Sequence, residues 1–523
     1  MKRLLRGLLA ATAFCASAAL VGGGVDPAQA TDLHTLVIGK SGDPDNLDPA
    51  VTMTNNSWTA TYPAYERLVR FKVEDGRGTT EVEGELAESW TVNEDGTVWT
   101  FTLAGGHKFA DGSPVDAEAV KFSFDRLLKI GKGPSDVFSS VEKVEAVDDR
   151  TVRFTLKEPF GPFLSTLVVD GAGIVNPAVM EHEVNGDMAQ GYLADHSMGS
   201  GAFQVASWEK GQRIVMEPNP HYGGPEPFFE QVVIRIVKEA TARRLQLEKG
   251  DLDIAEEIPV DQLSAMAEVP GVTIVDEPSF YVTYLYLNNE RAPLDNVKVR
   301  QALSYAIDYQ GIIDGILLGQ GIQMRGAIPK GLWGHDPSVM QYEYDLEKAK
   351  ALLAEAGVED LKLSYLYAKT DPNWELIGLV LQQNLAPLGI EVELQEFAYP
   401  TMRDKLDTGD FDIAVGNWTP DYADPSMFMN FWFDSERHGL AGNRSFYTNP
   451  KVDELIREAA TGSDQAERTK LYQEAQEIAV EEAAYVLLFQ RNYQFAMRDD
   501  VEGYAYNPML LQIWDFARMS KSE

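Results

Sequence analysis

The chain has 523 residues, of which 81 are acidic and 45 basic, and its formal net charge is −36 at pH 7. A surface this acidic repels phosphate backbones and anionic lipid heads, which excludes nucleic acids and membrane surfaces as partners. Because Cys15 is the only cysteine, a disulfide framework and a thiolate zinc site are excluded, and the 44% hydrophobic content predicts a large folded core.

The first thirty residues predict a cleavable secretory signal peptide. Three basic residues are followed by an apolar stretch over residues 8–21 and by the small-x-small sequence Ala28-Gln-Ala30. The apolar stretch is too short to span a bilayer comfortably, so a transmembrane anchor is the weaker interpretation. A lipoprotein would carry a small residue before its cysteine, and here Phe14 precedes Cys15. We therefore expect a soluble periplasmic protein that is cleaved near Ala30.

The next part of the chain mixes strands and helices. Residues 35–39 form a short apolar strand, and a loop rich in Pro, Asp and Asn follows over residues 42–49. Residues 90–103 alternate around a Glu-Asp-Gly turn, which predicts a β-hairpin. Asp116 is placed to cap a helix that ends near Lys129. Residues 152–156 alternate as a strand with one wet face, and Gly199-Ser-Gly201 then separates this block from a strand-rich stretch.

One segment occurs twice. Leu247-Glu-Lys-Gly-Asp-Leu-Asp-Ile-Ala255 and Leu406-Asp-Thr-Gly-Asp-Phe-Asp-Ile-Ala414 both fit the pattern L-x-x-G-D-x-D-I-A. Each predicts the end of a helix, a left-handed glycine and then a buried strand. The repetition indicates two lobes that contain the same unit, and chance convergence of two common turns is the alternative.

The second copy lies in a clear α/β region. Amphipathic helices are predicted over residues 299–307 and 345–357, and strands and helices then alternate along the chain. This order predicts parallel strands joined by right-handed crossovers. The predicted elements are strands at 361–367, 390–394 and 411–418 and helices at 373–386 and 400–407.

The loop after the last of these strands is the strongest candidate for a binding site. It reads Asn417-Trp-Thr-Pro-Asp-Tyr-Ala-Asp-Pro425, and ligands of open α/β sheets bind beyond the carboxyl ends of the strands. An aromatic ring beside a fixed carboxylate suits an organic ammonium group. The alternative is a structural loop in which Trp418 packs in the core and Asp421 or Asp424 caps the following helix.

No reactive motif points to an enzyme. The seven histidines are widely spread, and neither H-E-x-x-H, G-x-S-x-G nor a phosphate-binding loop occurs. Asp43, Asp45 and Asp48 look like the start of a calcium loop, but Pro44 and Pro49 interrupt the pattern. We therefore predict no catalytic residue, no metal site and no cofactor.

Several motifs together resemble the peptide and nickel import family of periplasmic solute-binding proteins, the oligopeptide- and dipeptide-binding type (family 5). The likeness extends over the whole chain after residue 30. The motifs are Leu86-Ala-Glu-Ser-Trp90, Asp95-Gly-Thr-Val-Trp-Thr-Phe-Thr-Leu103, Lys108-Phe-Ala-Asp-Gly-Ser-Pro-Val-Asp-Ala117, Gly199-Ser-Gly-Ala-Phe203, Pro293-Leu-Asp-Asn-Val-Lys-Val-Arg-Gln-Ala-Leu303 and Trp418-Thr-Pro-Asp-Tyr-Ala-Asp-Pro425.

The resemblance implies an α/β fold with two lobes that close on a ligand (class II, cluster C type) and an extra α+β domain on the first lobe. It implies the following division of the chain: signal peptide 1–30; first lobe 31–76, 199–284 and 490–523; extra domain 77–198; second lobe 285–489. The two copies of the repeated segment then fall one in each lobe.

The resemblance also implies a set of ligand-binding residues. Asp421 corresponds to the aspartate that binds the α-ammonium group of a peptide, and Trp418, Thr419 and Tyr399 correspond to residues that line the ligand. Met53 and Asn55 match a segment that runs along the ligand backbone, Phe138 matches a ligand-facing aromatic of the extra domain, and Lys369 is the match for a cation that meets the ligand carboxylate. Asn417 stands where the family has a glycine, and Pro420 is unusual.

The implied function is that of a binding protein of an ABC importer. It would capture a small solute, a short peptide, by closing its lobes, and it would deliver the solute as a monomer to permease subunits in the inner membrane. The alternative ligands are a nickel chelate, an oligosaccharide and an opine-like conjugate. A further alternative is a periplasmic peptide sensor or chaperone without a transport role.

Overall fold

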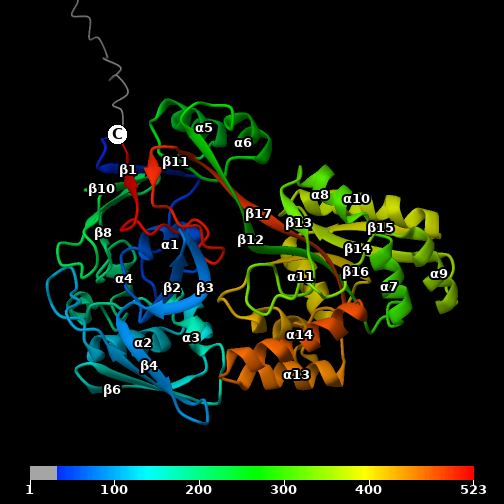
Figure 1. The fold of residues 1–523 in the computed structure, drawn as a ribbon, viewed down its shortest axis with the longest axis horizontal. Helices are drawn as coiled ribbons and strands as arrows, with labels where there is room; N and C mark the ends of the chain where they lie inside the picture. Colours follow the sequence, from blue (N-terminus) through cyan, green and yellow to red (C-terminus); the bar gives the residue numbers. More distant parts are fainter. Residues whose placement is uncertain (1–31, 523) are drawn as a thin grey trace, which may run out of the picture.

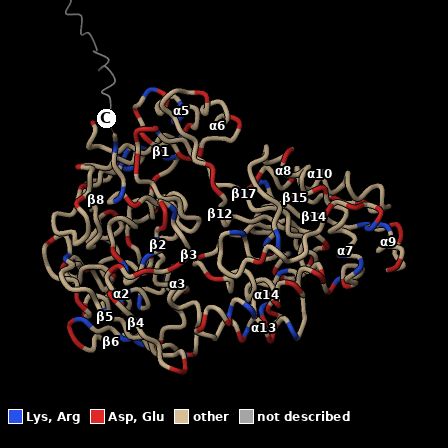
Figure 2. Tube along the Cα trace, viewed as in Figure 1, with Lys and Arg blue, Asp and Glu red and all other residues tan. Residues whose placement is uncertain are grey.

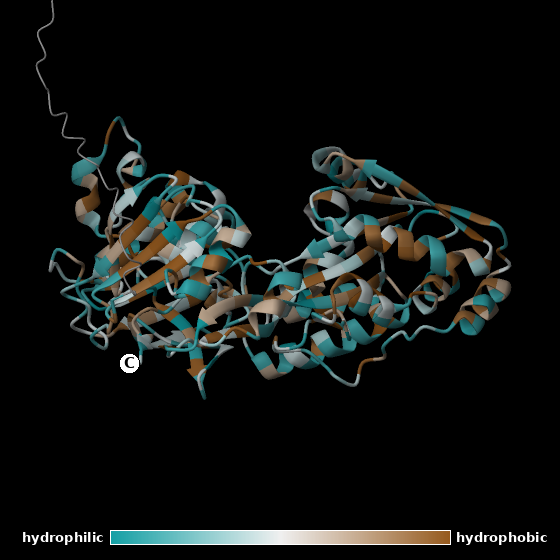
Figure 3. Ribbon diagram, turned by 90° about the horizontal axis from the view of Figure 1, so that it is seen from above, coloured by the Kyte–Doolittle hydropathy of each residue, from teal (hydrophilic) through white to brown (hydrophobic). Residues whose placement is uncertain are grey.

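The computed structural model describes residues 32–522, which form two lobes joined by a narrow middle (Figures 1 and 3). The predicted signal peptide lies outside the described residues. Acidic and basic residues are interspersed over both lobes (Figure 2). Within residues 32–522, no helix has the length and apolar character needed to cross a membrane.

One mixed sheet runs through both lobes. Its strands lie in the order β15-β14-β16-β12-β17-β11-β1-β10-β9-β8, with β13 beside β17. Their bounds are β1 Thr35–Lys40, β8 Phe203–Glu209, β9 Arg213–Pro218, β10 Gln231–Ile236, β11 Ile254–Ala255, β12 Val272–Leu287, β13 Gly321–Gln323, β14 Leu361–Ala368, β15 Ile390–Phe397, β16 Ile413–Trp418 and β17 Tyr485–Arg498.

The first-lobe half of the sheet is buried on both faces because its strands alternate. Leu36 and Ile38 of β1 pack with Trp514 of the C-terminal segment in one core. Val37 faces the opposite way and packs with Leu247 of helix α5 (Ala240–Lys249) and with helix α6 (Val260–Met266). The predicted first strand is confirmed, and it pairs in parallel with both β10 and β11.

Strands β12 and β17 connect the lobes. They pair antiparallel from Val272 to Tyr286, so each runs out of one lobe and into the other (Figure 1). The register shifts between Pro278 and Val282 and again between Thr283 and Tyr284. Bulges of this kind bend and twist a ladder, and these two lie where the sheet passes between the lobes. The middle of the molecule is therefore a two-stranded ribbon with a built-in irregularity.

The second lobe is the predicted α/β unit. Strand β14 pairs in parallel with β15 and with β16, and helix α10 packs on β14 and β15. The predicted helices and the parallel pairing are confirmed. The helices of this lobe are α7 Val297–Tyr305, α8 Tyr309–Ile316, α9 Leu346–Ala356, α10 Asn373–Leu385, α11 Tyr399–Thr408, α12 Met429–Phe433, α13 Pro450–Thr461 and α14 Gln465–Glu481.

The repeated segment has the same structure in both lobes. Helix α5 ends at Gly250 and helix α11 at Gly409, each glycine is left-handed, and each is followed by a strand parallel to its neighbour. The second aspartate of each copy accepts a hydrogen bond from a strand N–H, Asp253 from Val37 at 2.7 Å and Asp412 from Ser364 at 2.8 Å. The prediction of one such unit per lobe is confirmed.

These two aspartates are also paired with cations. Lys521 lies 2.8 Å from Asp253, and the Nε of Arg291 lies 2.8 Å from Asp412. A buried carboxylate is stable only when it is paired or hydrogen-bonded. The repeat therefore keeps its second aspartate because the residue ties the helix-to-strand turn to the neighbouring strand.

A separate four-stranded sheet lies at the lower end of the first lobe as it is drawn in Figure 1. It has the order β4-β5-β7-β6, contains the predicted hairpin and packs against helix α2, which Asp116 caps as expected. The elements are β4 Ala87–Val92, β5 Val98–Leu103, β6 Val141–Asp148, β7 Thr151–Leu156, α2 Ala117–Ile130, α3 Phe163–Thr166 and α4 Gln190–Leu193.

The hairpin that precedes this sheet bears on the expected domain boundary at residue 76. Strand β2 (Val69–Glu74) pairs with β3 (Arg77–Gly84), so that boundary falls in the turn between two paired strands. Two short strands, β18 Val501–Glu502 and β19 Ser520–Lys521, close the C-terminal segment beside β1. Helix α1 (Asn55–Thr61) follows β1 along the chain, and the side chain of Thr54 caps its first turn.

Candidate functional site

The carboxyl ends of the parallel strands in the second lobe lie at one edge of the sheet. Strand β14 ends at Ala368, β15 at Phe397 and β16 at Trp418, and their pairing is parallel. The predicted residues Lys369, Tyr399 and Thr419 follow these three ends. The order of the elements predicts a binding site at the carboxyl ends of these strands. Lys369, Tyr399 and Thr419 lie at this edge of the sheet.

Asp421 is the carboxylate without a partner in the loop after β16. No hydrogen bond or ion pair reaches its side chain from any residue between 32 and 522. The residue is exposed, yet nearby protein displaces part of its water, and this desolvation raises the pKa of the Asp421 carboxyl. A carboxylate that is partly desolvated and unpaired gains from binding a cation.

Asp424, the other carboxylate of the loop, has a structural role. Its Oδ1 accepts a hydrogen bond from the N–H of Ser426 at 2.9 Å and pairs with Arg468 at 2.8 Å, and both partners of the pair are buried. The alternative interpretation, in which an aspartate of this loop caps the following helix, is therefore correct for Asp424. Asp421 remains available for a ligand.

Two hollows lie between the lobes, and Asp421 lines both. The first, called the inner cavity, has a volume of about 50 Å³. The second, called the outer groove, has a volume of about 820 Å³. Residues of the first lobe and of the four-stranded unit form one wall of each, and Asp421 stands on the opposite side. The inner cavity is lined by Thr52, Met53, Trp58, Tyr62, Phe71, Pro134, Val137, Val168, Val169, Asp170, Gly171, Asp421, Met509, Leu510 and Ile513.

The outer groove is walled by the four-stranded unit and the second lobe. Lys157 and Phe160 stand on one side and Phe431 and Arg437 on the other. The two walls touch: the N–H of Gly161 donates to the carbonyl oxygen of Ala460 at 2.8 Å. The lobes therefore meet at two places, the β12–β17 ribbon and this contact, with the hollows between them.

Two of the predicted residues concern the wall formed by the first lobe and the four-stranded unit. Met53 is exposed and lines both hollows, as a ligand-contacting residue must. Phe138 is fully buried and packs edge-to-face on Phe124, so it belongs to the core of the four-stranded unit. The neighbouring residue, Val137, lines both hollows instead. Phe138 therefore lines neither hollow, and its neighbour in the chain does.

The other predicted residues lie near the hollows and do not line them. Trp418 stacks on Phe431 with ring centroids 4.4 Å apart, and Phe431 lines the outer groove. Thr419 and Asn55 are exposed, and Tyr399 is 40% exposed beside Trp374. Contact with a ligand therefore requires that the lobes approach further or that the ligand extend along the sheet edge.

Lys369 is engaged elsewhere. Its Nζ lies 2.8 Å from Glu396 on the adjacent strand β15, and this interaction raises the pKa of Lys369. Arg437 offers a cation in the outer groove: the described residues give its guanidinium no hydrogen bond or ion pair. Sequence reasoning missed Arg437 because nothing in a short surface helix distinguishes one arginine from another.

Asp170 and Trp58 are also missed by the sequence analysis. Both line the inner cavity, and each has a buried polar atom without a partner among the described residues. A signal for Asp170 exists in the sequence: an aspartate that closes the apolar stretch Phe163-Leu-Ser-Thr-Leu-Val-Val-Asp170 predicts a buried carboxylate.

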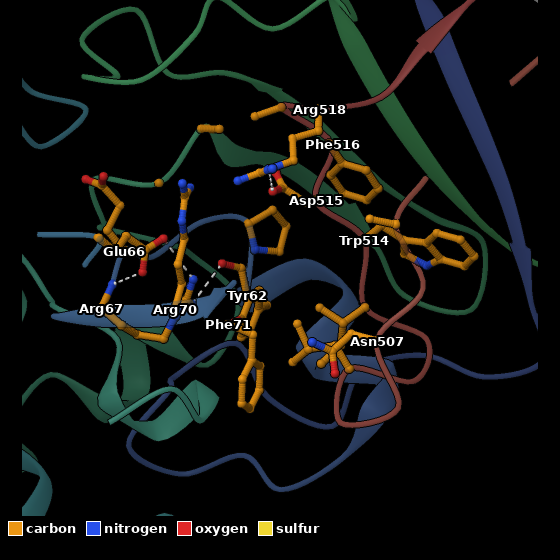
Figure 4. Close-up of a pocket in the computed structure, with 18 of the residues that line it drawn as sticks. Tyr62, Glu66, Arg67, Arg70, Phe71, Asn507, Trp514, Asp515, Phe516 and Arg518 are labelled. Atoms are coloured by element: carbon orange, nitrogen blue, oxygen red, sulfur yellow. Dashed lines mark hydrogen bonds and ion pairs between the residues drawn. The ribbon is translucent and has the colours of Figure 1, made fainter. Parts of the chain in front are cut away.

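A third hollow, the first-lobe cavity, has a volume of about 80 Å³ and holds none of the predicted residues (Figure 4). Its charged side chains pair with one another: Arg67 with Glu85 at 3.2 Å, and Arg518 with Asp515 at 2.9 Å. Tyr62 and Phe71 line both this cavity and the inner cavity, and so form the wall between them. Because its charges are already paired, we do not assign the ligand to it.

Two α/β lobes joined by a two-stranded ribbon, with hollows between them, form the fold of the two-lobed periplasmic binding proteins. Within residues 32–522, no group of three or more His, Cys, Asp or Glu side chains could hold a metal ion. Residues 81–439 match the model of the bacterial extracellular solute-binding proteins, family 5. The chain belongs to this family.

Known proteins resemble the chain over nearly its whole length. A probable D,D-dipeptide-binding periplasmic protein of Escherichia coli (strain K12) is 53% identical, over 93% of this chain and 94% of its own. HbpA2 from Haemophilus parasuis superposes with a TM-score of 0.86 at 28% identity, covering 94% and 100% of the two chains. A periplasmic binding protein from Helicobacter pylori, solved with the peptide STSA, gives 0.74 at 28% identity, covering 94% and 98%.

Proposed function

We propose that this protein is the periplasmic binding component of an ABC importer and that it captures short peptides, dipeptides above all. Its task is recognition without chemistry: it holds the peptide between its lobes and passes it, as a monomer, to a permease in the inner membrane. The signal peptide would direct export and would be cleaved near Ala30.

The observation that carries the proposal is the unpaired carboxylate of Asp421 between the lobes. A peptide has one permanent cation that is free of its side chains, the α-ammonium group. Placing this group against Asp421 neutralises a partly desolvated anion and gives a charge-assisted hydrogen bond. Sugars have no such cation, so an oligosaccharide could offer this carboxylate hydroxyl donors but no opposite charge.

Arg437 is our proposed partner for the carboxylate of the peptide, in place of Lys369. Its guanidinium lines the same groove as Asp421 and is unpaired among the described residues, whereas Glu396 already neutralises Lys369. A guanidinium binds a carboxylate through two parallel hydrogen bonds, which a lysine cannot match. A zwitterionic ligand thus finds unpaired charges of both signs in the outer groove, Asp421 and Arg437 among them.

The relative that is 53% identical is named for D,D-dipeptides, which favours a dipeptide as the ligand. The Helicobacter pylori protein holds the four-residue peptide STSA, so short peptides in general remain in the proposal.

Within the division of the chain expected from the sequence, we move the start of the extra domain to about residue 85, after the β2–β3 hairpin. The lobe boundaries at 284 and 489 fall inside β12 and β17, where a hinge belongs.

Calorimetry with a matched set of ligands tests the proposal. D-alanyl-D-alanine, L-alanyl-L-alanine, the N-acetylated form of each and maltose would be titrated into the purified mature protein. We expect a free dipeptide to bind and its N-acetylated form to bind at least tenfold more weakly, because acetylation removes the ammonium group. Equal binding of free and acetylated peptides, or tight binding of maltose alone, would refute the proposal.

A further inference from the structure

Asp170 is a buried carboxylate with one oxygen unused. It begins a short 3-10 turn (Asp170–Ala172) after helix α3 and is 5% exposed. Its Oδ1 accepts a hydrogen bond from Thr61 Oγ1 at 2.8 Å, while its Oδ2 is buried with no partner among the described residues. The residue lines the inner cavity together with Asp421. One carboxylate from each lobe therefore borders the same small space.

The charges near Asp170 are committed to other groups. Arg67 lies over the ring of Tyr62 and pairs with Glu85 at 3.2 Å. Asp48, which also acts on Asp170, pairs with the buried Arg126. The pKa of Asp170 is raised to about 7, chiefly by burial and also by Asp48, while Thr61 and Arg67 act to lower it.

Trp58 supplies the complementary group. Its indole Nε1–H is buried without a partner among the described residues, and the side chain lines the inner cavity. Buried polar groups in folded proteins are nearly always hydrogen-bonded, and an exception calls for an explanation. Here the two residues that carry an unused acceptor and an unused donor line one cavity, on the wall that faces Asp421.

We propose that Asp170 and Trp58 form the first-lobe half of the ligand site and bind one peptide group of the ligand. Asp170 Oδ2 accepts the peptide N–H and Trp58 Nε1–H donates to the carbonyl oxygen, while Asp421 holds the ammonium group from the second lobe. This inference rests on the proposed function and adds to it a requirement for an amide N–H next to the N-terminal residue.

An ester analogue tests this requirement. D-alanyl-D-alanine and D-alanyl-D-lactate differ only in that an ester oxygen replaces the peptide N–H. Against wild type we expect the amide to bind about 10- to 100-fold more tightly, because the ester leaves Asp170 unsatisfied. In Asp170→Asn, which keeps the oxygen that accepts from Thr61, the ratio should fall below about threefold. In Trp58→Phe both affinities should fall by a similar factor.

The outcomes separate the two proposals. The same comparison is made with the L,L amide and ester, and if wild type binds no compound of either series, the proposed function fails. If it binds both equally, or if Asp170→Asn keeps the full preference for the amide, the present inference fails and the proposed function stands. Should Asp170→Asn not fold, the ratio of the two wild-type affinities is measured between pH 6 and 8. We expect the ratio to rise with pH as Asp170 ionises, and a constant ratio overturns the inference. Asp421 acts equally on both ligands, so its effect cancels in the ratio.

Discussion

Replacing Asp421 by asparagine isolates the charge on which the proposed function depends. The amide has nearly the shape of the carboxylate and keeps an acceptor oxygen, but it loses the negative charge. Asp421 has no hydrogen bond or ion pair among residues 32–522. The substitution therefore breaks no contact of the folded protein, and the free energy of unfolding should change by less than about 0.5 kcal/mol.

The effect on binding should be much larger. A hydrogen bond to a charged group contributes about 1.5 to 3 kcal/mol, and removing one member of a charge pair that becomes desolvated on closure costs about 2 to 5 kcal/mol. Because Asp421 is exposed before the ligand arrives, part of that cost is screened by water. We expect a loss of about 2 to 4 kcal/mol, which is about a 30- to 700-fold rise in Kd.

Calorimetry on wild type and Asp421→Asn with a free dipeptide measures this loss, and thermal unfolding without ligand confirms the fold. Asp136→Asn is the matched control, because Asp136 is an exposed acid of the same outer groove on the opposite wall. It should leave Kd within about threefold. A Kd for Asp421→Asn within threefold of wild type, or an equal loss in both variants, would show that the site does not depend on this carboxylate.

Three further predictions concern the same lobes. Arg437→Gln should weaken dipeptide binding by about tenfold or more, whereas Lys369→Gln should leave it unchanged because Glu396 already pairs with that lysine; equal losses in calorimetry would contradict the assignment. Arg126→Met leaves the fully buried Asp48 without its ion pair and should lower the free energy of unfolding by about 3 to 5 kcal/mol in urea titration, and a change under 1 kcal/mol would refute this. Burial raises the pKa of Glu85 from 4.5 to about 7, so the folded state binds more protons between these values and the free energy of unfolding should fall as pH rises from 4.5 to 7. Glu85→Gln should make that slope shallower without abolishing it, because the raised pKa of Asp170 contributes a slope of the same sign. An unchanged slope would show that Glu85 does not contribute.

The fold was accessible from the sequence because its signals are local. Alternation, capping residues and the order of strands and helices are set by neighbours a few positions apart, and the repeated L-x-x-G-D-x-D-I-A segment marks a turn whose glycine and aspartates have fixed local roles. The wrongly placed features depend on distant contacts. The expected boundary at residue 76 falls inside the β2–β3 hairpin, because the pairing of β2 with β3 cannot be read from the alternation of either strand.

The site shows the same division. Asp421 could be singled out as a candidate because it follows a strand end in a recognisable loop, which is a local feature. The roles of Lys369 and Phe138 were set by tertiary contacts: the register of β14 and β15 brings Glu396 to Lys369, and the core closes over Phe138 while Val137 faces the hollow. Two neighbouring residues can point to opposite sides, so that one lies in the core and the other lines the hollow. A motif match does not show which of the two does so.

The distribution of the polar groups has a consequence for how the lobes close. The second lobe presents exposed charges, Asp421 and Arg437, which a ligand can reach while the lobes are apart. The first lobe presents buried groups, Asp170 and Trp58, whose hydrogen bonds become available only when a ligand is pressed into the inner cavity. A ligand drives closure only by the difference between its affinities for the closed and open states. Under the two proposals, capture thus depends on the charges of the second lobe, and closure depends on the unsatisfied groups on the first-lobe side.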